Sequence, residues 1–276
     1  MEKLQAALAR AREKRDNDGR PVHRTNPALR SGARRAAREQ DILARWNALG
    51  SFVPSEKSME KSRIFATKAS GEAQHFDILR TKLLLEMRRN DWTRIAVTSA
   101  SPNCGKTTIA CNLIAGLGRT PEVRGMLFDM DFRRPSVAKT FGVDLQNSFE
   151  SVLEDDIPFA EHGLRWHENT CVAMLKGVVN DPARIVLRSR TMEIFDAIQD
   201  EYAPHLMLFD TPPVMISDET RGFLKSVDAV LIIAAADSTS VAQVDEVERE
   251  VAQYTNVAGI LLNKCRFMEE DYGYTY

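Results

Sequence analysis

The sequence predicts an α/β domain in which a mostly parallel central sheet carries helices on both faces. Short apolar runs alternate with helix-forming segments through residues 71–263, which is the pattern of successive strand–helix units. The run at residues 227–236 is almost continuously apolar, as expected of a strand that is covered on both sides. Because ligands of such sheets bind beyond the carboxyl ends of the strands, functional residues are expected at that edge.

The individual elements follow from periodicity and from capping residues. Apolar residues from Phe76 to Met87 recur at helical spacing, so a helix with one buried face precedes the first strand. Asp181 is expected to cap a long helix, and Pro182 and Pro135 suit the first turns of their helices. Strands are expected at residues 94–97, 125–129, 171–175, 206–209, 227–236 and 257–262, and further helices at 106–118, 148–154, 181–202, 217–225 and 238–254.

Length and composition narrow the class of protein. The 276 residues suit one large domain with appendages, and the composition is that of a soluble globular protein. The longest apolar run is far too short to span a bilayer, and the chain opens with charged residues rather than an apolar signal segment. The four cysteines form no CxxC pair and no metal-ligand spacing, which indicates free thiols in a reducing cytoplasm.

Charge and composition divide the chain into three parts. Residues 1–62 are expected to form a basic arm and linker, with helices at 2–15 and around 36–49. The first 50 residues hold 12 Lys and Arg against 6 Asp and Glu, whereas the rest of the chain holds 25 against 33. Such an arm either binds a partner or a membrane surface or is simply solvated, and both interpretations stay open. Residues 63–264 form the α/β domain, and residues 265–276 form a flexible tail.

The most informative segment is a strand, a tight loop and a helix start at residues 95–108. From Ala100 the spacing is A-x-x-x-x-G-K-T, a phosphate-binding loop with Ala in place of the usual first Gly. Backbone N–H groups and the helix dipole favour an anion there. Lys106 supplies a charge for the β- and γ-phosphates, and the Thr107 hydroxyl is a ligand for Mg²⁺. The candidate nucleotide-binding residues of this segment are Ser101, Pro102, Asn103, Cys104, Gly105, Lys106, Thr107 and Thr108.

Two further strands end in carboxylates. One apolar strand leads into the pattern D-x-D-x-R at residues 129–133, and another leads into D-T-P-P at residues 210–213. The carboxylates are those of Asp129, Asp131 and Asp210. A carboxylate at a strand end beside a phosphate loop is placed to hold Mg²⁺, usually through water. The three segments together indicate a binding site for ATP and Mg²⁺.

These three segments resemble the Walker A, Walker A′ and Walker B motifs of the bacterial tyrosine kinases. Those are deviant P-loop proteins related to the chromosome-partitioning and cell-division-site ATPases. The resemblance covers about residues 70–276, and the lack of a second lysine at residues 99–101 favours the kinase branch. It implies the P-loop NTPase fold, transfer of the ATP γ-phosphate to tyrosine, and a role in capsule or exopolysaccharide production.

The resemblance also implies how the phosphates and the metal are held. Lys106 and the loop amides of residues 103–108 hold the phosphates. Thr107 binds Mg²⁺ directly, with Asp131 and Asp210 acting directly or through water.

The remaining site residues have one expected role and one alternative each. The resemblance implies that Asp129 accepts the tyrosine proton, with Asp131 as the alternative. Arg133 or Arg134 is expected to help bind phosphate, with a surface salt bridge as the alternative for Arg134. Asn263 follows the last strand and either meets the adenine base or caps the strand end.

The chain ends in a tyrosine cluster. Three of its five tyrosines are Tyr272, Tyr274 and Tyr276. The resemblance implies that this tail is autophosphorylated in trans, in the active site of a neighbouring copy. Each phosphate adds about −1.5 to −2 charges, which on a tail that already holds acids at 269–271 favours release from an acidic site. The alternative is a chain end with incidental tyrosines.

One family feature is not preserved. The kinases commonly carry a Glu-x-x-Arg-x-x-Arg oligomerisation motif before the first strand, where this chain has Gln74, Asp77 and Arg80. Only the last position matches, so a ring held by that motif is not expected, whereas another form of self-association stays open.

The leading hypothesis is a protein-tyrosine autokinase that regulates polymerisation and export of exopolysaccharide or capsule. Its expected partners are a membrane-anchored polysaccharide co-polymerase of the chain-length type, a second copy and a tyrosine phosphatase, with no nucleic acid. It is expected in the cytoplasm, at the inner face of the cell membrane through that partner. The alternative is a regulatory ATPase whose nucleotide state switches partner binding without tyrosine phosphorylation. A third hypothesis, an assembly factor without catalysis, conflicts with the intact acids.

Overall fold

The computed structural model describes residues 27–236 and 238–265, with side chains from residue 35 onward. The chain divides into two compact units, residues 1–41 and 42–276. The elements that carry the predicted motifs all lie in the second unit.

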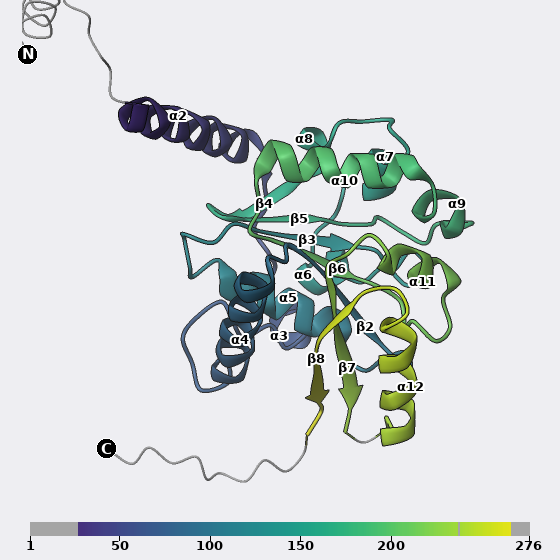
Figure 1. Cartoon of the computed structure of the whole chain (residues 1–276). Coiled ribbons are helices and arrows are strands. Elements are labelled where there is room, and N and C mark those ends of the chain that lie inside the picture. The colour runs from purple at the N-terminus through teal and green to yellow at the C-terminus, as the bar shows by residue number, and fades with distance from the viewer. Residues whose placement is uncertain (1–26, 237, 266–276) are drawn as a thin grey trace, which may run out of the picture. The chain divides into compact units, whose positions relative to one another are not determined.

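Eight strands of the described residues form a single sheet (Figure 1). They are β1 (Gly50–Ser51), β2 (Arg94–Ser99), β3 (Gly125–Asp129), β4 (Leu164–His167), β5 (Thr170–Ala173), β6 (Leu206–Asp210), β7 (Ala229–Ala235) and β8 (Asn256–Asn263). Their order across the sheet is β1-β4-β5-β3-β6-β2-β7-β8. All strands except β1 and β4 run the same way, since β4 pairs antiparallel with β5 and β1 pairs parallel with β4. The predicted fold class is therefore confirmed.

Helices cover both faces of this sheet, as the sequence predicts. They are α3 (Glu56–Lys61), α4 (Gln74–Asn90), α5 (Lys106–Leu117), α6 (Val137–Phe141), α7 (Phe149–Leu153), α8 (Phe159–His162), α9 (Pro182–Val186), α10 (Ser189–Tyr202), α11 (Asp218–Leu224) and α12 (Val241–Val251). Helices α4, α5 and α6 contribute to the core on one face, and α10, α11 and α12 to the core on the other.

The prediction of one long helix at residues 181–202 is wrong. The segment forms α9 and α10, because Arg188 between them takes an extended conformation. The Thr191 hydroxyl donates to the Ile185 carbonyl at 2.5 Å and so ties the two helices together. Asp181 precedes α9 with a left-handed backbone, but its side chain forms no capping hydrogen bond.

Residues 130–170 contain more regular structure than the sequence predicts. Helix α8 and strand β4 were not expected there, because both are only four residues long and carry no clear periodicity. Pro135 precedes α6 rather than lying in its first turn, since Ser136 occupies the N-cap position.

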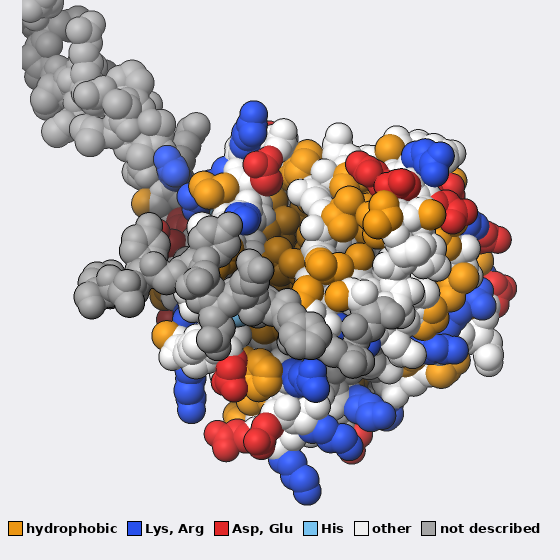
Figure 2. Space-filling model, turned by 90° about the horizontal axis from the view of Figure 1, so that it is seen from below, with side chains coloured by type: hydrophobic (Ala, Val, Ile, Leu, Met, Phe, Trp, Pro, Cys, Tyr) orange, Lys and Arg blue, Asp and Glu red, His pale blue; other side chains and the backbone are white. Residues whose placement is uncertain are grey.

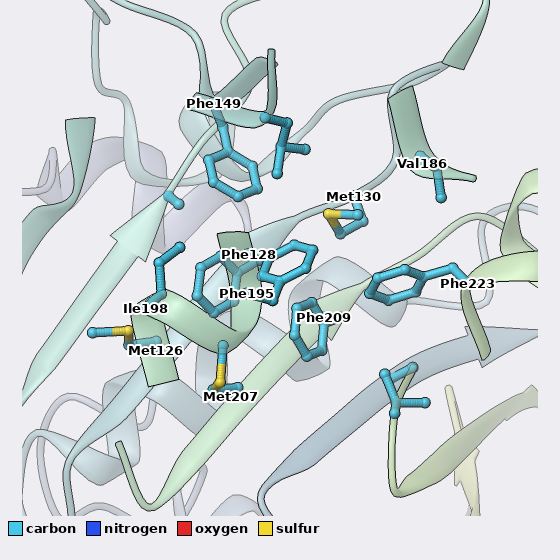
Figure 3. Packing of buried hydrophobic residues seen from close by; sticks show 14 of the residues in the cluster. Met126, Phe128, Met130, Phe149, Val186, Phe195, Ile198, Met207, Phe209 and Phe223 are labelled. Carbon is cyan, nitrogen blue, oxygen red and sulfur yellow. The ribbon is translucent and has the colours of Figure 1, made fainter. Parts of the chain in front are cut away.

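Alternation along the strands places side chains in two separate cores. Phe128 of β3 and Phe209 of β6 point to one face and stack with ring centroids 5.1 Å apart (Figure 3). Phe195 of α10 meets both rings edge-on. Leu127 and Leu208 point to the opposite face, where α5 is buried along most of its length.

Residues 42–62 also belong to the second unit. Helix α2 (Pro27–Ala48) ends there, and its Trp46 side chain is 1% exposed and donates to the Tyr202 carbonyl at 2.7 Å. After β1, the Phe52 ring packs against Phe141 and Trp166. The second expected helix, around residues 36–49, is thus present and longer, whereas the one at 2–15 lies outside the described residues.

Figure 2 shows the molecule from below, with hydrophobic side chains between Lys, Arg, Asp and Glu side chains. Within the described parts of the chain, no helix combines the length and the apolar character that crossing a bilayer requires.

Candidate nucleotide and magnesium site

The phosphate loop connects β2 to α5, as the sequence predicts. Gly105 lies at the N-cap of α5 with a φ of 98°, a left-handed conformation that glycine adopts without strain. A Cβ atom at this position would lie 2.2 Å from Nδ2 of Asn263. That nitrogen donates to the Cys104 carbonyl at 2.8 Å, so Asn263 at the end of β8 supports the loop. Lys106 follows and is 7% exposed.

The carboxylates of Asp129 and Asp210 end two neighbouring strands, and that of Asp210 contacts the phosphate loop. Asp129 and Asp210 are register partners on β3 and β6, two positions beyond Leu127 and Leu208. Side chains two positions apart share a face, so both carboxylates lie on the α5 side of the sheet. The Thr107 hydroxyl donates to Asp210 Oδ2 at 2.5 Å.

Burial raises the pKa of all three strand-end carboxylates. Burial, opposed by the Thr107 hydrogen bond and Lys106, raises the pKa of Asp210 to about 7. Burial and the neighbouring Asp210 raise the pKa of Asp129 well above its ordinary value. Burial also raises the pKa of Asp131, although a hydrogen bond from the Arg134 backbone opposes it.

Asp129 and Asp131 occupy different places despite their proximity in sequence. The Asp129 carboxylate is fully buried and accepts backbone N–H groups from Asp131 at 3.3 Å and from Ser136 and Val137 at 3.2 Å. It therefore holds the turn after β3 in place. Asp131 is half-buried and lines the cleft beside the phosphate loop.

That cleft has a volume of about 700 Å³ and lies at the edge of the sheet where functional residues were expected. Its charged side chains are Lys106, Asp131, Arg133, Arg134 and Lys264. Four of the five are cationic, so the expectation of an acidic site is wrong for the wall of this cleft. The loop residues Pro102, Asn103, Gly105, Thr107 and Thr108 also line it.

The sequence did not predict three residues with contacts in or beside the cleft: Ser136 and Lys264, which line it, and Glu219, which contacts Arg133. Ser136 places its hydroxyl 2.9 Å from that of Thr107. Buried Glu219 at the start of α11 accepts from Arg133 Nε at 2.5 Å, which fixes Arg133 at the cleft. Lys264 follows β8 directly. No sequence signal marks these residues as partners, because each is near the loop only after the sheet forms.

Two predicted loop residues lie apart from the cleft wall. Cys104 is fully buried, and its thiol contacts Ser101 and Thr239. Burial would raise the pKa of this thiol, but the hydrogen bonds outweigh it and lower the pKa. Ser101 accepts a hydrogen bond from Ser99 through its carbonyl, so both residues shape the loop from within. The tail tyrosines lie outside the described residues.

The oxygen atoms at this site are of the kind that bind Mg²⁺. Oδ1 of Asp210 is buried without a hydrogen-bond partner, and Oδ2 of the same carboxylate is next to the Thr107 hydroxyl. Hard oxygen donors of this kind suit Mg²⁺. Across the described residues no three His, Cys, Asp or Glu side chains form a metal site by themselves. Mg²⁺ commonly takes one or two ligands from the protein and the rest from phosphate oxygens and water.

Asp77 and Arg80, which align with the oligomerisation motif of the bacterial tyrosine kinases, form contacts within this chain. Arg80 donates to the Asp77 carboxylate at 2.9 Å and to the Gly116 carbonyl at 2.7 Å. Arg119 forms a second ion pair with Asp77. The one matching arginine thus ties α4 to α5.

The fold and this cleft are those of a P-loop protein, with the phosphate loop between β2 and α5. Its sequence relatives and its structural neighbours include bacterial tyrosine kinases, which confirms the resemblance predicted from the three motifs. No protein-family model matches the chain.

Two relatives show the extent of the similarity. The chain is 26% identical over 199 residues to AmsA of Erwinia amylovora, covering 71% of this chain and 27% of AmsA. It is 23% identical over 187 residues to the tyrosine-protein kinase etk of Escherichia coli K12, covering 67% of this chain and 25% of etk. The chain spans about a quarter of the length of the first curated relatives it matches.

The solved structures agree on the fold. The kinase domain of the Escherichia coli tyrosine kinase ETK superposes with a TM-score of 0.65 at 21% identity, covering 75% of this chain and 81% of that domain. The cell division ATPase MinD of Pyrococcus furiosus superposes with a TM-score of 0.52 at 18% identity, covering 62% of this chain and 71% of MinD. The fold is therefore common to a tyrosine kinase domain and a cell division ATPase.

Proposed function

We propose that this chain is a protein-tyrosine autokinase that transfers the γ-phosphate of ATP to tyrosines of its own C-terminal tail. The observation that carries the proposal is Asp131, whose half-buried carboxylate lines the cleft, whereas the carboxylates of Asp129 and Asp210 are fully buried. The names of the sequence relatives and the cluster of Tyr272, Tyr274 and Tyr276 support it.

Each part of the cleft has a distinct task. Lys106 and the loop amides bind the phosphates, and Arg133 adds positive charge while Glu219 fixes its position. Thr107 and Asp210 hold Mg²⁺, which neutralises charge on the phosphates when bound. Most of the acceleration comes from this positioning and charge neutralisation.

Asp131 is the proton acceptor in this scheme, and Asp129 is a positioning residue. The tyrosine phenol oxygen forms a bond to the γ-phosphorus, the bond from that phosphorus to the bridging oxygen breaks, and ADP leaves. The phenol proton passes to Asp131. Because burial raises the pKa of Asp131, its carboxylate is a stronger base than an exposed one.

The adenine base fits a second groove beside the cleft. This groove has a volume of about 460 Å³ and shares Thr108 and Lys264 with the cleft. Its wall is mostly apolar, with Phe65 and Ile109, and Asn263 lies on it. An aromatic base with a polar edge suits such a surface.

The biological setting rests on the resemblance. We assign the chain a role in polymerisation and export of exopolysaccharide or capsule, activated by a membrane-anchored co-polymerase and reversed by a tyrosine phosphatase. That partner places it at the inner face of the membrane, and phosphorylation in trans requires a second copy.

Mass spectrometry of the C-terminal tryptic peptide, which begins at Phe267, tests the activity in native cells. We expect phosphotyrosine on this peptide in the wild type and none in a Lys106→Ala strain. A wild-type peptide without phosphate contradicts the proposal. A cellular phenotype shared by wild type and the Tyr272/Tyr274/Tyr276→Phe variant, but lost with Lys106→Ala, supports a switching ATPase instead.

A further inference from the structure

The wall of the nucleotide cleft carries two cations to which the proposed phosphate transfer assigns no role. Lys106 serves the phosphates, and Arg133 is paired with Glu219. Arg134 and Lys264 also line the cleft and are exposed, and within the described part of the chain neither forms an ion pair. Two exposed cations at the mouth of a catalytic cleft favour an anionic segment of substrate.

Arg134 lies close enough to Asp131 to contact the residues that precede an acceptor tyrosine. Its backbone N–H donates to Asp131 Oδ1 at 2.9 Å, so Arg134 is adjacent to the proposed proton acceptor. When the phenol of a tyrosine reaches Asp131, the three residues before that tyrosine lie within about 10 Å of its Cα, since an extended chain spans roughly 3.3–3.6 Å per residue. Arg134 is therefore within reach of those side chains.

The tail of this chain supplies matching charges. Glu269, Glu270 and Asp271 directly precede Tyr272. We propose that Arg134 and Lys264 form a recognition site for these acidic residues on the tail of a second copy. The inference rests on the proposed kinase function and adds to it a substrate class, tyrosines preceded by acids.

A second copy is the donor of this segment because the proposed phosphorylation in trans already brings the tail of one molecule into the cleft of another. Arg134 follows β3 and Lys264 follows β8, and both line the cleft that such a tail would enter.

The test separates the enzyme from the acceptor in two full-length chains. The enzyme copy carries Tyr272, Tyr274 and Tyr276→Phe, and the acceptor copy carries Lys106→Met. The acceptor has either its native tail or a neutral tail with Glu269→Gln, Glu270→Gln and Asp271→Asn. The measured quantity is the ratio of kcat/KM for phosphotyrosine formation on the two tails.

We expect a preference of about five- to tenfold for the acidic tail at low salt, which is the scale of two or three exposed ion pairs. It should fall toward one at high ionic strength because exposed charges are screened. Arg134→Glu with Lys264→Glu should bring the ratio to one or below. Arg89→Glu on α4 is the matched control, since its side chain is 79% exposed, and should keep the preference.

A wild-type ratio of one at low salt overturns the inference, as does a full preference in the Arg134/Lys264 variant.

A binding assay tests recognition of the tail independently of kinase activity. Fluorescence anisotropy of labelled peptides of residues 266–276, acidic and neutral, is measured with a non-hydrolysable ATP analogue present. If no acceptor is phosphorylated but the acidic peptide binds about fivefold tighter, the kinase proposal fails and the recognition site stands. Equal binding of the two peptides overturns the recognition site.

Discussion

Replacing Gly105 by alanine tests how the phosphate loop is supported. The residue has a φ of 98°, where an L-amino acid costs about 1–2 kcal/mol. The new Cβ would lie 2.2 Å from Asn263 Nδ2 and would displace that side chain. The hydrogen bond from Asn263 to the Cys104 carbonyl is then lost, at about 1 kcal/mol. Together the free energy of unfolding should fall by about 2–3 kcal/mol.

A double-mutant cycle separates the two contributions. In an Asn263→Ala background the collision is absent, so Gly105→Ala should cost only the backbone strain, about 1–2 kcal/mol. Urea denaturation of the full chain, followed by tryptophan fluorescence, measures all four proteins. Gly71→Ala is the matched control, because a Cβ there meets nothing within 4 Å, and it should change stability by less than about 0.5 kcal/mol.

Two outcomes would refute this account of the loop. If Gly105→Ala costs the same with and without Asn263, the contact between β8 and the loop does not constrain the glycine. If it costs no more than Gly71→Ala, the left-handed conformation carries no penalty. Isothermal titration with ATP adds a functional measure, since the displaced loop should also bind nucleotide more weakly.

Three further predictions concern burial and charge. Burial lowers the pKa of His162 to about 4, from 6.5, so its contribution to stability is complete above pH 6.5 and is lost as the pH falls toward 4. Relative to His162→Gln, the wild type should lose about 2 kcal/mol between pH 8 and pH 5, and a pH-independent difference in urea unfolding contradicts this. Trp46→Ala should lower the free energy of unfolding by about 3–5 kcal/mol, because the ring is only 1% exposed. If the variant and the wild type have the same melting temperature, residues 42–62 add nothing to the core. Asp210→Asn should weaken ATP binding about 10–100-fold in Mg²⁺ but little in EDTA; equal losses in both titrations would exclude Asp210 as a metal ligand.

Local patterns were sufficient for most of the strand–helix framework. The boundaries of β3 agree with the prediction at both ends, because a buried apolar run stops at a carboxylate. Helix α5 begins at Lys106, where a glycine with left-handed backbone starts the helix. The break at Arg188 could not be predicted, because it depends on contacts such as that of Arg188 with the Leu153 carbonyl, which come from a distant segment.

The sequence by itself determined that a phosphate loop and acids at two further strand ends meet at one edge of a parallel sheet. Only the tertiary structure decided what each acid does there. Asp129 and Asp131 are two residues apart, yet one is enclosed by backbone N–H groups and the other lines the cleft. The same holds for the cations, since Arg134 after β3 and Lys264 after β8 line one cleft although three strands separate β3 from β8 in the sheet. The local sequence determines which residues end a strand. The burial of their side chains and the residues they contact depend on how distant elements pack around that strand end.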